Sequence, residues 1–430
     1  MTIDRQEQPT RAWVLHPDIK SSDPRKDSGR RSAEHALGEG VALTAALPGL
    51  EVAGQTIVPL PKVRPGFLFG SGKTNELGNM LADNEVELVI VDGPLTPVQQ
   101  RNLEKAWSVK ILDRTGLILE IFSDRAQTRE GVLQVEMAAL SYQRTRLVRA
   151  WTHLERQRGG LGFVGGPGET QIEADRRAID DQIVRLRRQL EKVVKTRDLH
   201  RSARAKVPYP IVALVGYTNA GKSTLFNYLT GAEVMAKDML FATLDPTMRS
   251  VQLPSGRDII LSDTVGFISE LPTELVAAFR ATLEEVLSAD LIVHVRDISH
   301  PDSETQAKDV EQILTTLGIQ QDVKRVEVLN KLDLVEDAVR DALEIRADRS
   351  EETFAVSALT GEGLDALLET ISNRLTDPKT EETIVLPWAD GRKRAWLFDQ
   401  GVIEAERQEE DGFHLDLLWT ARQKKRYREL

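Results

Sequence analysis

Side chains suited to binding a nucleotide phosphate gather first in GYTNAGKST, residues 216–224, which follows the apolar run IVALV. Gly216 stands six residues before Lys222. At that spacing backbone N–H groups can wrap a β-phosphate while the lysine reaches the β- and γ-oxygens. STLFNYLTG predicts a helix whose N-terminus adds partial positive charge at the same point. The segment therefore predicts a phosphate-binding loop between a buried strand and a helix.

A second segment, GSGKT at 70–74, has the same ending without the rest of the loop. The residue six positions before Lys73 is Phe67, and the preceding PGFLF is short for a buried strand. We interpret this segment as the N-terminal cap region of the helix TNELGNML, not as a phosphate site.

A carboxylate that could complete a magnesium site lies in DTVG, residues 263–266, at the end of the predicted strand DIILS. We expect the Ser223 hydroxyl to ligate Mg²⁺ and Asp263 to hold the hydration shell of the ion. The Gly266 N–H would then sense the γ-phosphate, as switch segments of nucleotide hydrolases do.

The segment NKLD, residues 330–333, follows the predicted strand RVEVL and has the chemistry to select guanine. Asp333 can accept from N1–H and the 2-amino group of guanine, whereas adenine would leave that carboxylate unpaired. Lys331 would pack over the base, and Asn330 would tie this loop to the phosphate loop. A backbone N–H from Ser357-Ala358-Leu359, at the end of TFAVSA, would reach guanine O6. The predicted nucleotide-binding residues are Gly216, Tyr217, Thr218, Asn219, Ala220, Gly221, Lys222, Ser223, Thr224, Asp263, Thr264, Val265, Gly266, Asn330, Lys331, Asp333, Ser357, Ala358 and Leu359.

Three positions bear on hydrolysis. These motifs resemble those of P-loop GTPases, and Thr243, in KDMLFATLDPT, sits where such GTPases place a switch threonine. The resemblance implies that Thr243 ligates Mg²⁺ only when the γ-phosphate is present; Thr247 or a structural role are the alternatives. Lys222, Thr243 and Gly266 are the predicted catalytic set. Phe267 stands where many relatives of this fold carry the glutamine that orients water, so we expect slow turnover that a large target accelerates. Asn219 is similar to the asparagine that helps hold K⁺ in potassium-stimulated GTPases, and the alternative is a turn residue.

The phosphate loop, DTVG, NKLD and Ser357-Ala358-Leu359 occur in this order, each at the carboxyl end of a predicted strand. Together they resemble the translation-factor-related class of P-loop GTPases. The predicted fold class is α/β: a P-loop GTPase domain after a small α/β domain with a long antiparallel helical hairpin, and before a small α+β domain. The expected boundaries are 1–40 for an N-terminal arm with a flexible insertion in its polar residues 16–40, 41–128 for the α/β subdomain, 129–205 for the hairpin, 206–376 for the GTPase domain and 379–430 for the α+β domain.

The predicted hairpin carries the positive charge of an otherwise acidic chain. Residues 129–206 hold 17 Lys and Arg against 10 Asp and Glu, while the whole chain has a net charge of −11. A basic segment on an acidic protein indicates a localised contact with nucleic acid or an acidic partner, or else a solvated helical surface. The glycine-rich break between the helices predicts a narrow tip that can approach RNA. The candidate RNA contacts are Arg156, Arg158, Gly162, Gly165, Gly166, Arg176 and Arg177.

Composition limits the class of protein further. The 430 residues include no cysteine, which excludes a disulfide framework and thiolate metal sites. No window approaches the ~20 apolar residues of a membrane span, and the first residues lack a signal-peptide pattern. We therefore expect a soluble, cytoplasmic protein.

DRTGLILEIF, EGVLQVEMAALSYQRTRLVRAW, HLERQRGG and GGPGETQIEADRR, all ahead of the GTPase motifs, resemble the HflX family of ribosome-associated GTPases. The resemblance implies a monomer that binds GTP, GDP and Mg²⁺ and docks on the large ribosomal subunit or the 70S ribosome through its N-terminal part. It implies that the hairpin tip reaches ribosomal RNA near the peptidyl-transferase region. It further implies splitting or rescue of stalled or idle ribosomes under stress, hydrolysis stimulated by the ribosome, and secondary ATP hydrolysis in some members.

Two departures and two alternatives accompany this resemblance. Val164-Gly165-Gly166 leaves no arginine directly before Gly-Pro-Gly-Glu, where the family pattern has one, and the segment after residue 378 matches the family loosely. The alternatives are a GTPase of ribosome assembly or RNA modification, and a slow GTP sensor.

Overall fold

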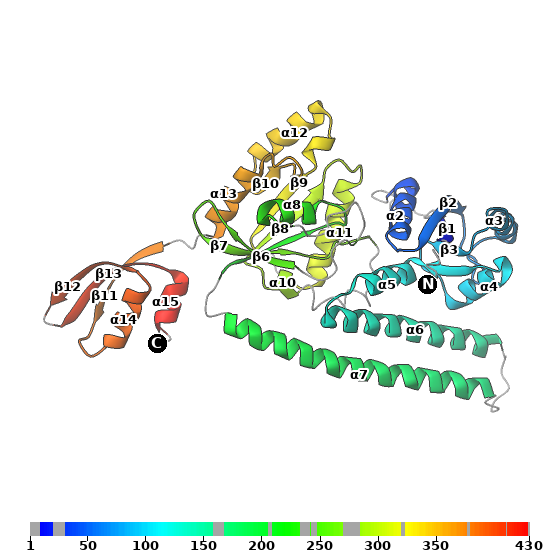
Figure 1. Cartoon of the computed structure of the whole chain (residues 1–430), viewed down its shortest axis with the longest axis horizontal. Coiled ribbons are helices and arrows are strands. Elements are labelled where there is room, and N and C mark those ends of the chain that lie inside the picture. Colours follow the sequence, from blue (N-terminus) through cyan, green and yellow to red (C-terminus); the bar gives the residue numbers. More distant parts are fainter. Residues whose placement is uncertain are drawn as a thin grey trace, which may run out of the picture. The chain divides into compact units, whose positions relative to one another are not determined.

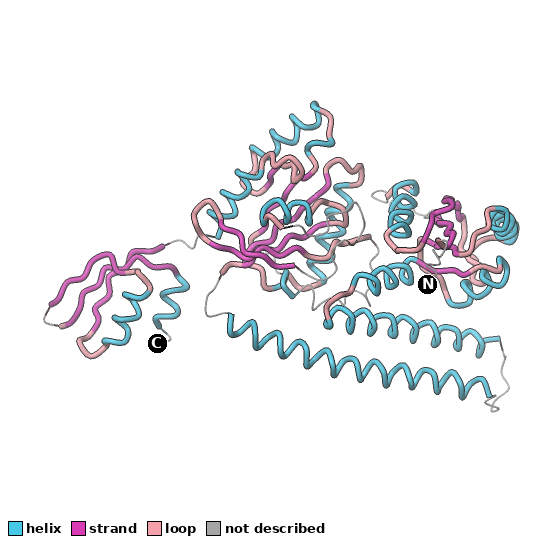
Figure 2. The backbone as a smooth tube through the Cα atoms, viewed as in Figure 1, coloured by secondary structure: helices cyan, strands magenta, loops and turns pink. Residues whose placement is uncertain are grey.

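The protein is described by a computed structural model that covers residues 9–19, 31–157, 167–204, 209–232, 241, 247–269, 284–319, 323–375, 379–409 and 411–428. The chain divides into two compact units, one of Met1–Gln252 with Asp258–Ala366 and one of Leu253–Arg257 with Leu367–Leu430. Figure 1 shows the elements in chain order and Figure 2 separates helices, strands and loops. No helix of the described part of the chain is long and apolar enough to cross a membrane.

The N-terminal part of the first unit is a four-stranded sheet in which all pairs are parallel, in the order β2-β1-β3-β4. Its elements are β1 (Thr10–Ile19), α2 (Ala33–Ala45), β2 (Leu50–Leu60), α3 (Ser71–Asp83), β3 (Leu88–Val91), α4 (Pro97–Trp107), β4 (Lys110–Asp113) and α5 (Arg114–Arg125). The flexible insertion predicted over 16–40 is therefore wrong where β1 continues to Ile19 and where α2 begins. TRAWVLHPDI has one short apolar run, AWVL, and the strand continues past it because β1 pairs with a strand on each edge.

Strand β3 shows why this sheet needs helices on both faces. Leu88 and Ile90 belong to one apolar cluster with α2 and α5, whereas Val89 and Val91 belong to another with α3 and α4. Because successive side chains point to opposite faces, an entirely apolar strand must be covered on both sides. All four residues of β3 are buried accordingly.

Two helix starts in this domain have clear local causes. Thr96 caps α4, and its hydroxyl accepts from the Gln99 N–H at 3.2 Å while the Gln99 side chain accepts from the Thr96 N–H at 2.9 Å. This reciprocal pair is the capping box that fixes where a helix starts. In GSGKT, Gly70 is the N-cap of α3, so this segment begins a helix as expected.

Two long helices follow, α6 (Arg129–Gln157) and α7 (Pro167–Arg204), which lie side by side (Figures 1 and 2). Their seam consists of Leu133, Leu140, Ile183 and Leu186, with Met137, Ile179, Leu190 and Val193 against it. The helical hairpin predicted for this part of the chain is thus built on apolar residues such as Leu133 and Leu140, since residues seven apart recur on one helix face.

A six-stranded sheet forms the rest of the first unit, in the order β10-β9-β8-β5-β7-β6. Five strands are parallel, and β6 pairs antiparallel with β7 at the edge. The elements are β5 (Ile211–Gly216), α8 (Lys222–Thr230), β6 (Thr247–Gln252), β7 (Asp258–Asp263), α10 (Glu284–Leu287), β8 (Leu291–Asp297), α11 (Ser303–Thr316), β9 (Arg325–Asn330), η1 (Leu332–Leu334), α12 (Asp337–Asp348) and β10 (Thr353–Ala355). Helix α13 (Leu364–Leu375) follows β10 and belongs to the second unit from Leu367 on. The α/β fold class is thereby confirmed.

The second unit has an antiparallel sheet in the order β11-β13-β12. Its elements are β11 (Lys379–Leu386), α14 (Gly391–Asp399), β12 (Ile403–Glu409), β13 (Gly412–Thr420) and α15 (Ala421–Arg428). Trp419, Leu397 and Leu415 form its small core. Strands β12 and β13 pair antiparallel as a hairpin, with Glu409 opposite Gly412.

Candidate functional site

The loop between β5 and α8 has the backbone that a phosphate cradle requires. Gly216 has φ +154°, and a Cβ there would lie 2.1 Å from the Val295 carbonyl oxygen. Gly221 has φ +90°, and a Cβ there would lie 2.2 Å from Asn330 Nδ2. Neither position can take a side chain without moving a neighbouring strand or loop, so both glycines follow from the geometry. The strand, loop and helix occur in the order that the sequence predicted.

Lys222 opens α8 and is buried beneath this loop. Its Nζ donates to the carbonyl oxygens of Gly216 at 3.1 Å and of Tyr217 at 2.9 Å. Burial lowers the pKa of Lys222 to about 8, although the nearby Asp263 carboxylate acts in the opposite direction. A phosphate would supply the negative charge that this partly desolvated ammonium group favours.

Ser223 and Asp263 bring a hydroxyl and a carboxylate together. Ser223 Oγ donates to Asp263 Oδ2 at 2.7 Å, and Asp263 is fully buried at the end of β7. Oxygen donors of this kind suit Mg²⁺, which keeps several of its waters and takes further ligands from substrate phosphates. The donor set therefore fits a magnesium ion held by the serine directly and by the aspartate through water.

Asn330 joins the loop after β9 to the phosphate loop. Its Nδ2 donates to the Ala220 carbonyl at 2.8 Å, and its Oδ1 accepts from the Ala358 N–H at 2.9 Å. Asn330 is 2 % exposed, so both amide ends are satisfied inside the protein. One side chain thus holds three loops at the carboxyl ends of β5, β9 and β10, which is where ligands of parallel α/β sheets bind.

The other residues predicted to read a base lie beside Asn330. Asp333 Oδ1 accepts from Ser357 Oγ at 2.5 Å, which orients the carboxylate. Lys331 Nζ lies 2.8 Å from Asp297 Oδ2 at the end of β8, a partner that the sequence prediction did not include. Leu359 is 73 % exposed. The sequence could have identified Asp297 as a site residue, because Asp297 ends an apolar strand at the same edge of the sheet.

The segment after DTVG pairs with the phosphate loop. The Thr218 N–H donates to the Phe267 carbonyl at 2.7 Å, and the Phe267 N–H donates to the Gly216 carbonyl at 3.1 Å. These bonds form an isolated parallel bridge between Tyr217 and Phe267, beyond the β5–β7 ladder that ends at Leu214 and Asp263. The Phe267 side chain is buried in the main apolar cluster. Its chemistry and its burial both exclude it from orienting water.

A buried polar network beside this segment was not expected from the sequence. Arg114, the first residue of α5, donates to Asp92 Oδ1 at 2.6 Å, to Glu39 Oε1 at 3.0 Å and to the Ser269 carbonyl at 3.1 Å. Burial opposes the charge of Arg114, but the Glu39 and Asp92 carboxylates outweigh it and raise its pKa. Asp92 also lies 2.8 Å from His16 Nδ1.

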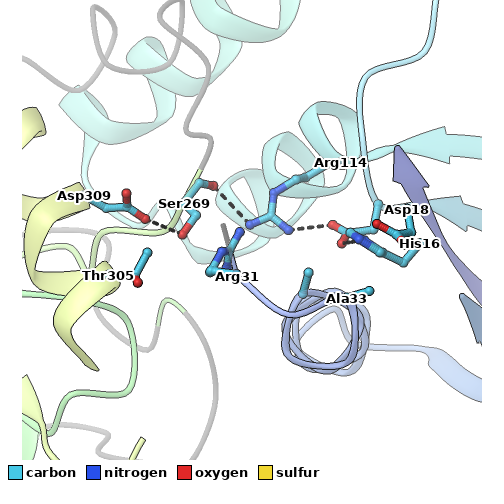
Figure 3. A pocket seen from close by; sticks show the side chains of 10 residues that line it. His16, Asp18, Arg31, Ala33, Arg114, Ser269, Thr305 and Asp309 are labelled. Atoms are coloured by element: carbon cyan, nitrogen blue, oxygen red, sulfur yellow. Dashed lines mark hydrogen bonds and ion pairs between the residues drawn. The ribbon is translucent and has the colours of Figure 1, made fainter. Parts of the chain in front are cut away.

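This network lines a polar cavity of about 220 Å³ (Figure 3). Its walls come from the N-terminal sheet domain, through His16 and Arg114, and from the six-stranded sheet domain, through Ser269, Thr305 and Asp309. Segments far apart in the sequence therefore meet next to the segment that follows DTVG.

Several predicted residues lie outside the described part of the chain. They are Thr243, Arg158, Gly162, Gly165 and Gly166. Arg156 lies in α6, but its side chain is not among the described ones. Arg176 and Arg177 lie on α7, with side chains 57 % and 79 % exposed.

A parallel sheet with this strand–loop–helix phosphate cradle, a hydroxyl–carboxylate pair and an NKLD loop defines a P-loop GTPase. Four family models match the chain: GTP-binding GTPase N-terminal over 34–123, GTP-binding GTPase middle region over 125–204, 50S ribosome-binding GTPase over 211–331, and HflX C-terminal domain over 342–428. The last match covers the segment that resembled the family only loosely.

The GTPase HflX of Magnetococcus marinus is 50 % identical over 382 residues, 89 % of this chain and 87 % of that protein. The GTPase HflX of Escherichia coli is 43 % identical over 379 residues, 87 % of this chain and 86 % of that protein. A crystal structure of a GTP-binding protein from Sulfolobus solfataricus in complex with GDP aligns with a TM-score of 0.45 and 22 % identity, over 85 % of this chain and 98 % of that chain. The chain belongs to the HflX family of GTPases.

Proposed function

We propose that this GTPase binds GTP with Mg²⁺ at the loop after β5 and uses the nucleotide to control its docking on the large ribosomal subunit or the 70S ribosome. Lys222 would hold the β- and γ-phosphates, Ser223 would ligate Mg²⁺, and Asp263 would hold its water shell. Asp333 would select guanine, and Asn330 would fix the loops around the base.

The observation that supports the ribosomal partner most directly is the match of residues 211–331 to the 50S ribosome-binding GTPases. The charge of the hairpin supports the same partner. Arg176 and Arg177 project from α7 with exposed side chains, and their ion-pair partners Asp180 and Glu173 lie at 3.9 and 3.7 Å. Such long, solvated pairs contribute little, so these arginines remain available to RNA phosphates.

We further propose that the docked, GTP-bound protein splits or rescues stalled or idle ribosomes and that the ribosome accelerates hydrolysis. Phe267 supplies no group that orients water, so the ribosome would supply or position one. Thr243 would complete the Mg²⁺ shell only with the γ-phosphate present. Asn219, an exposed residue of the phosphate loop, would hold a K⁺ ion beside the phosphates.

GTP hydrolysis measured with and without purified large subunits tests this proposal, with subunit dissociation followed by light scattering. We expect slow hydrolysis alone, a steep rise with large subunits, and loss of scattering from 70S ribosomes only with GTP. Equal hydrolysis with and without ribosomal particles contradicts the proposal. Stimulation by precursor particles or free RNA alone would instead support a role in assembly, and co-sedimentation separates the two.

Charge-reversal variants distinguish the contribution of the hairpin to ribosomal stimulation from that of the rest of the surface. Arg176→Glu with Arg177→Glu should weaken the stimulation by large subunits and reduce its salt dependence, because two phosphate contacts are lost. Lys308→Glu with Arg349→Glu changes the net charge equally at exposed positions of the six-stranded domain and should leave stimulation unchanged. Equal rates of GTP hydrolysis in KCl and in NaCl would exclude the K⁺ site.

A further inference from the structure

The segment Gly266–Ser269, here named the DTVG extension, closes over the phosphate loop. As described above, the Phe267 carbonyl accepts from the Thr218 N–H of this loop, and the Phe267 N–H donates to the Gly216 carbonyl. A Cβ placed on Gly266 would lie 3.1 Å from Lys222 Nζ and 2.8 Å from Thr218 Cα. The Lys222 ammonium, which would reach the β- and γ-phosphates of a nucleotide, donates instead to the Gly216 and Tyr217 carbonyl oxygens.

The hydroxyl of Tyr217 holds the far end of the DTVG extension. This oxygen accepts from the Ser269 N–H at 2.8 Å and lies 2.7 Å from Ser269 Oγ. It also donates to Glu39 Oε1, on α2 of the N-terminal domain, at 2.7 Å. Tyr217 is 6 % exposed, and burial together with the Glu39 carboxylate raises its pKa, so the phenol keeps its proton near neutral pH.

Ser269 is held from two further directions. Asp309, on α11, accepts from Ser269 Oγ at 2.6 Å, and Arg114 donates to the Ser269 carbonyl at 3.1 Å (Figure 3). Arg114 is itself fixed by two carboxylates of the N-terminal domain, Asp92 and Glu39. One serine of the GTPase domain thus connects the phosphate loop to the N-terminal domain.

Opening of the DTVG extension would disturb buried groups. Gly266 must turn its N–H to the γ-phosphate in the GTP state, and GDP makes no such demand. The movement would take Ser269 away from Tyr217 and Arg114, which would then lose partners inside the protein. A buried polar group that loses its partner opposes such a movement.

We propose that Tyr217 is a positioning residue whose hydroxyl latches the DTVG extension to the phosphate loop and to the N-terminal domain, so that binding of a γ-phosphate at Gly266 opposes the contacts of Ser269 with Tyr217 and Arg114. The latch lowers the affinity for GTP relative to GDP. It also makes the contact between the N-terminal domain and Ser269 depend on which nucleotide is bound. This inference rests on the GTPase activity of the family and does not depend on the proposed ribosomal partner.

Tyr217→Phe tests the latch, because it keeps the ring and removes only the hydroxyl. Titration with a non-hydrolysable GTP analogue and with GDP should show that the ratio of GTP to GDP affinity rises about tenfold, since a hydrogen bond to a charged group is lost from the closed form. The KM for GTP should fall by a similar factor, while kcat changes less than about twofold. Tyr209→Phe, at an exposed tyrosine of the same domain, should leave the ratio unchanged.

Ser269→Ala provides an independent variant, since it removes the Oγ contacts and leaves the backbone. If the two side chains act through one latch, Tyr217→Phe with Ser269→Ala should shift the affinity ratio no more than the larger single change. Thermal unfolding of each variant shows whether the variant is folded. An unchanged ratio in folded Ser269→Ala, equal losses of GTP and GDP affinity, or additive effects in the double variant would each overturn the proposal.

Discussion

Asn330→Ala is the substitution whose effect follows most directly from the contacts of the site. The change removes the 2.8 Å bond to the Ala220 carbonyl and the 2.9 Å bond from the Ala358 N–H. The Ala220 carbonyl and the Ala358 N–H then lose this partner in a region where Asn330 itself is 2 % exposed. Each buried group without its partner costs about 1–3 kcal/mol, and partial access of water favours the lower end. We therefore expect a loss of about 2–4 kcal/mol.

This free energy should appear as lost affinity, because nucleotide binding must then order the three loops that Asn330 holds in advance. Affinity for GDP should fall by about 30- to 700-fold, with a similar change for GTP. Asn330→Asp should lose at least as much, since its carboxylate can still accept from the Ala358 N–H but faces the Ala220 carbonyl with an oxygen instead of a donor.

Titration with a fluorescent GDP analogue measures the effect, and thermal unfolding without nucleotide separates it from loss of fold. Asn373→Ala, at an exposed position of α13, serves as the control and should bind as the parent does. A GDP affinity within about twofold of the parent, in an Asn330→Ala protein that is folded, would refute the bridging role.

Three further outcomes are expected. Asp333→Asn should lower GTP affinity by about 100-fold and favour xanthosine triphosphate, whose 2-oxo group accepts from the new amide; competition titrations measure this, and an unchanged order of affinities contradicts it. Burial lowers the pKa of His294 to about 4, so the unfolded chain binds more protons between pH 6.5 and 4, and stability should fall by up to about 3 kcal/mol as pH falls through that window. His294→Gln should flatten this part of the profile in urea unfolding; an unflattened profile would assign the acid sensitivity elsewhere. Gly412→Ala, where φ is +143° and a Cβ would lie 2.3 Å from the Leu386 carbonyl, should lower the melting temperature of the second unit in calorimetry without changing GDP affinity, while Gly391→Ala meets no atom within 4 Å and should change neither.

Much of the nucleotide site could be predicted from the sequence, because its parts are local. The six-residue spacing from Gly216 to Lys222 and the position of Asn330 after a strand each describe one loop. Parallel strands then bring the loops to one edge of the sheet, so the Asn330–Ala220 contact followed from order along the chain. The roles of these residues toward GTP remain predictions that the experiments above address.

The N-terminal strand could not be predicted in the same way. Thr10–Ile19 has no strong local pattern, and its place between β2 and β3 depends on pairing with segments about forty and eighty residues away. A strand paired on both edges is stabilised by ladder hydrogen bonds and by helices on two faces, and neither contribution is visible in a ten-residue window.

The sequence by itself determined the class of site, since short spacings specify a backbone cradle, a hydroxyl–carboxylate pair and a base-reading carboxylate. Only the tertiary structure decided what the tyrosine of that cradle touches. Tyr217 meets Glu39 across 178 positions of sequence, and Arg114 meets Ser269 across 155. Polar side chains that pair at such separations leave no periodic pattern in the sequence, because the way two domains fold against each other decides which side chains meet. The pairs then persist because an unpaired buried charge costs free energy.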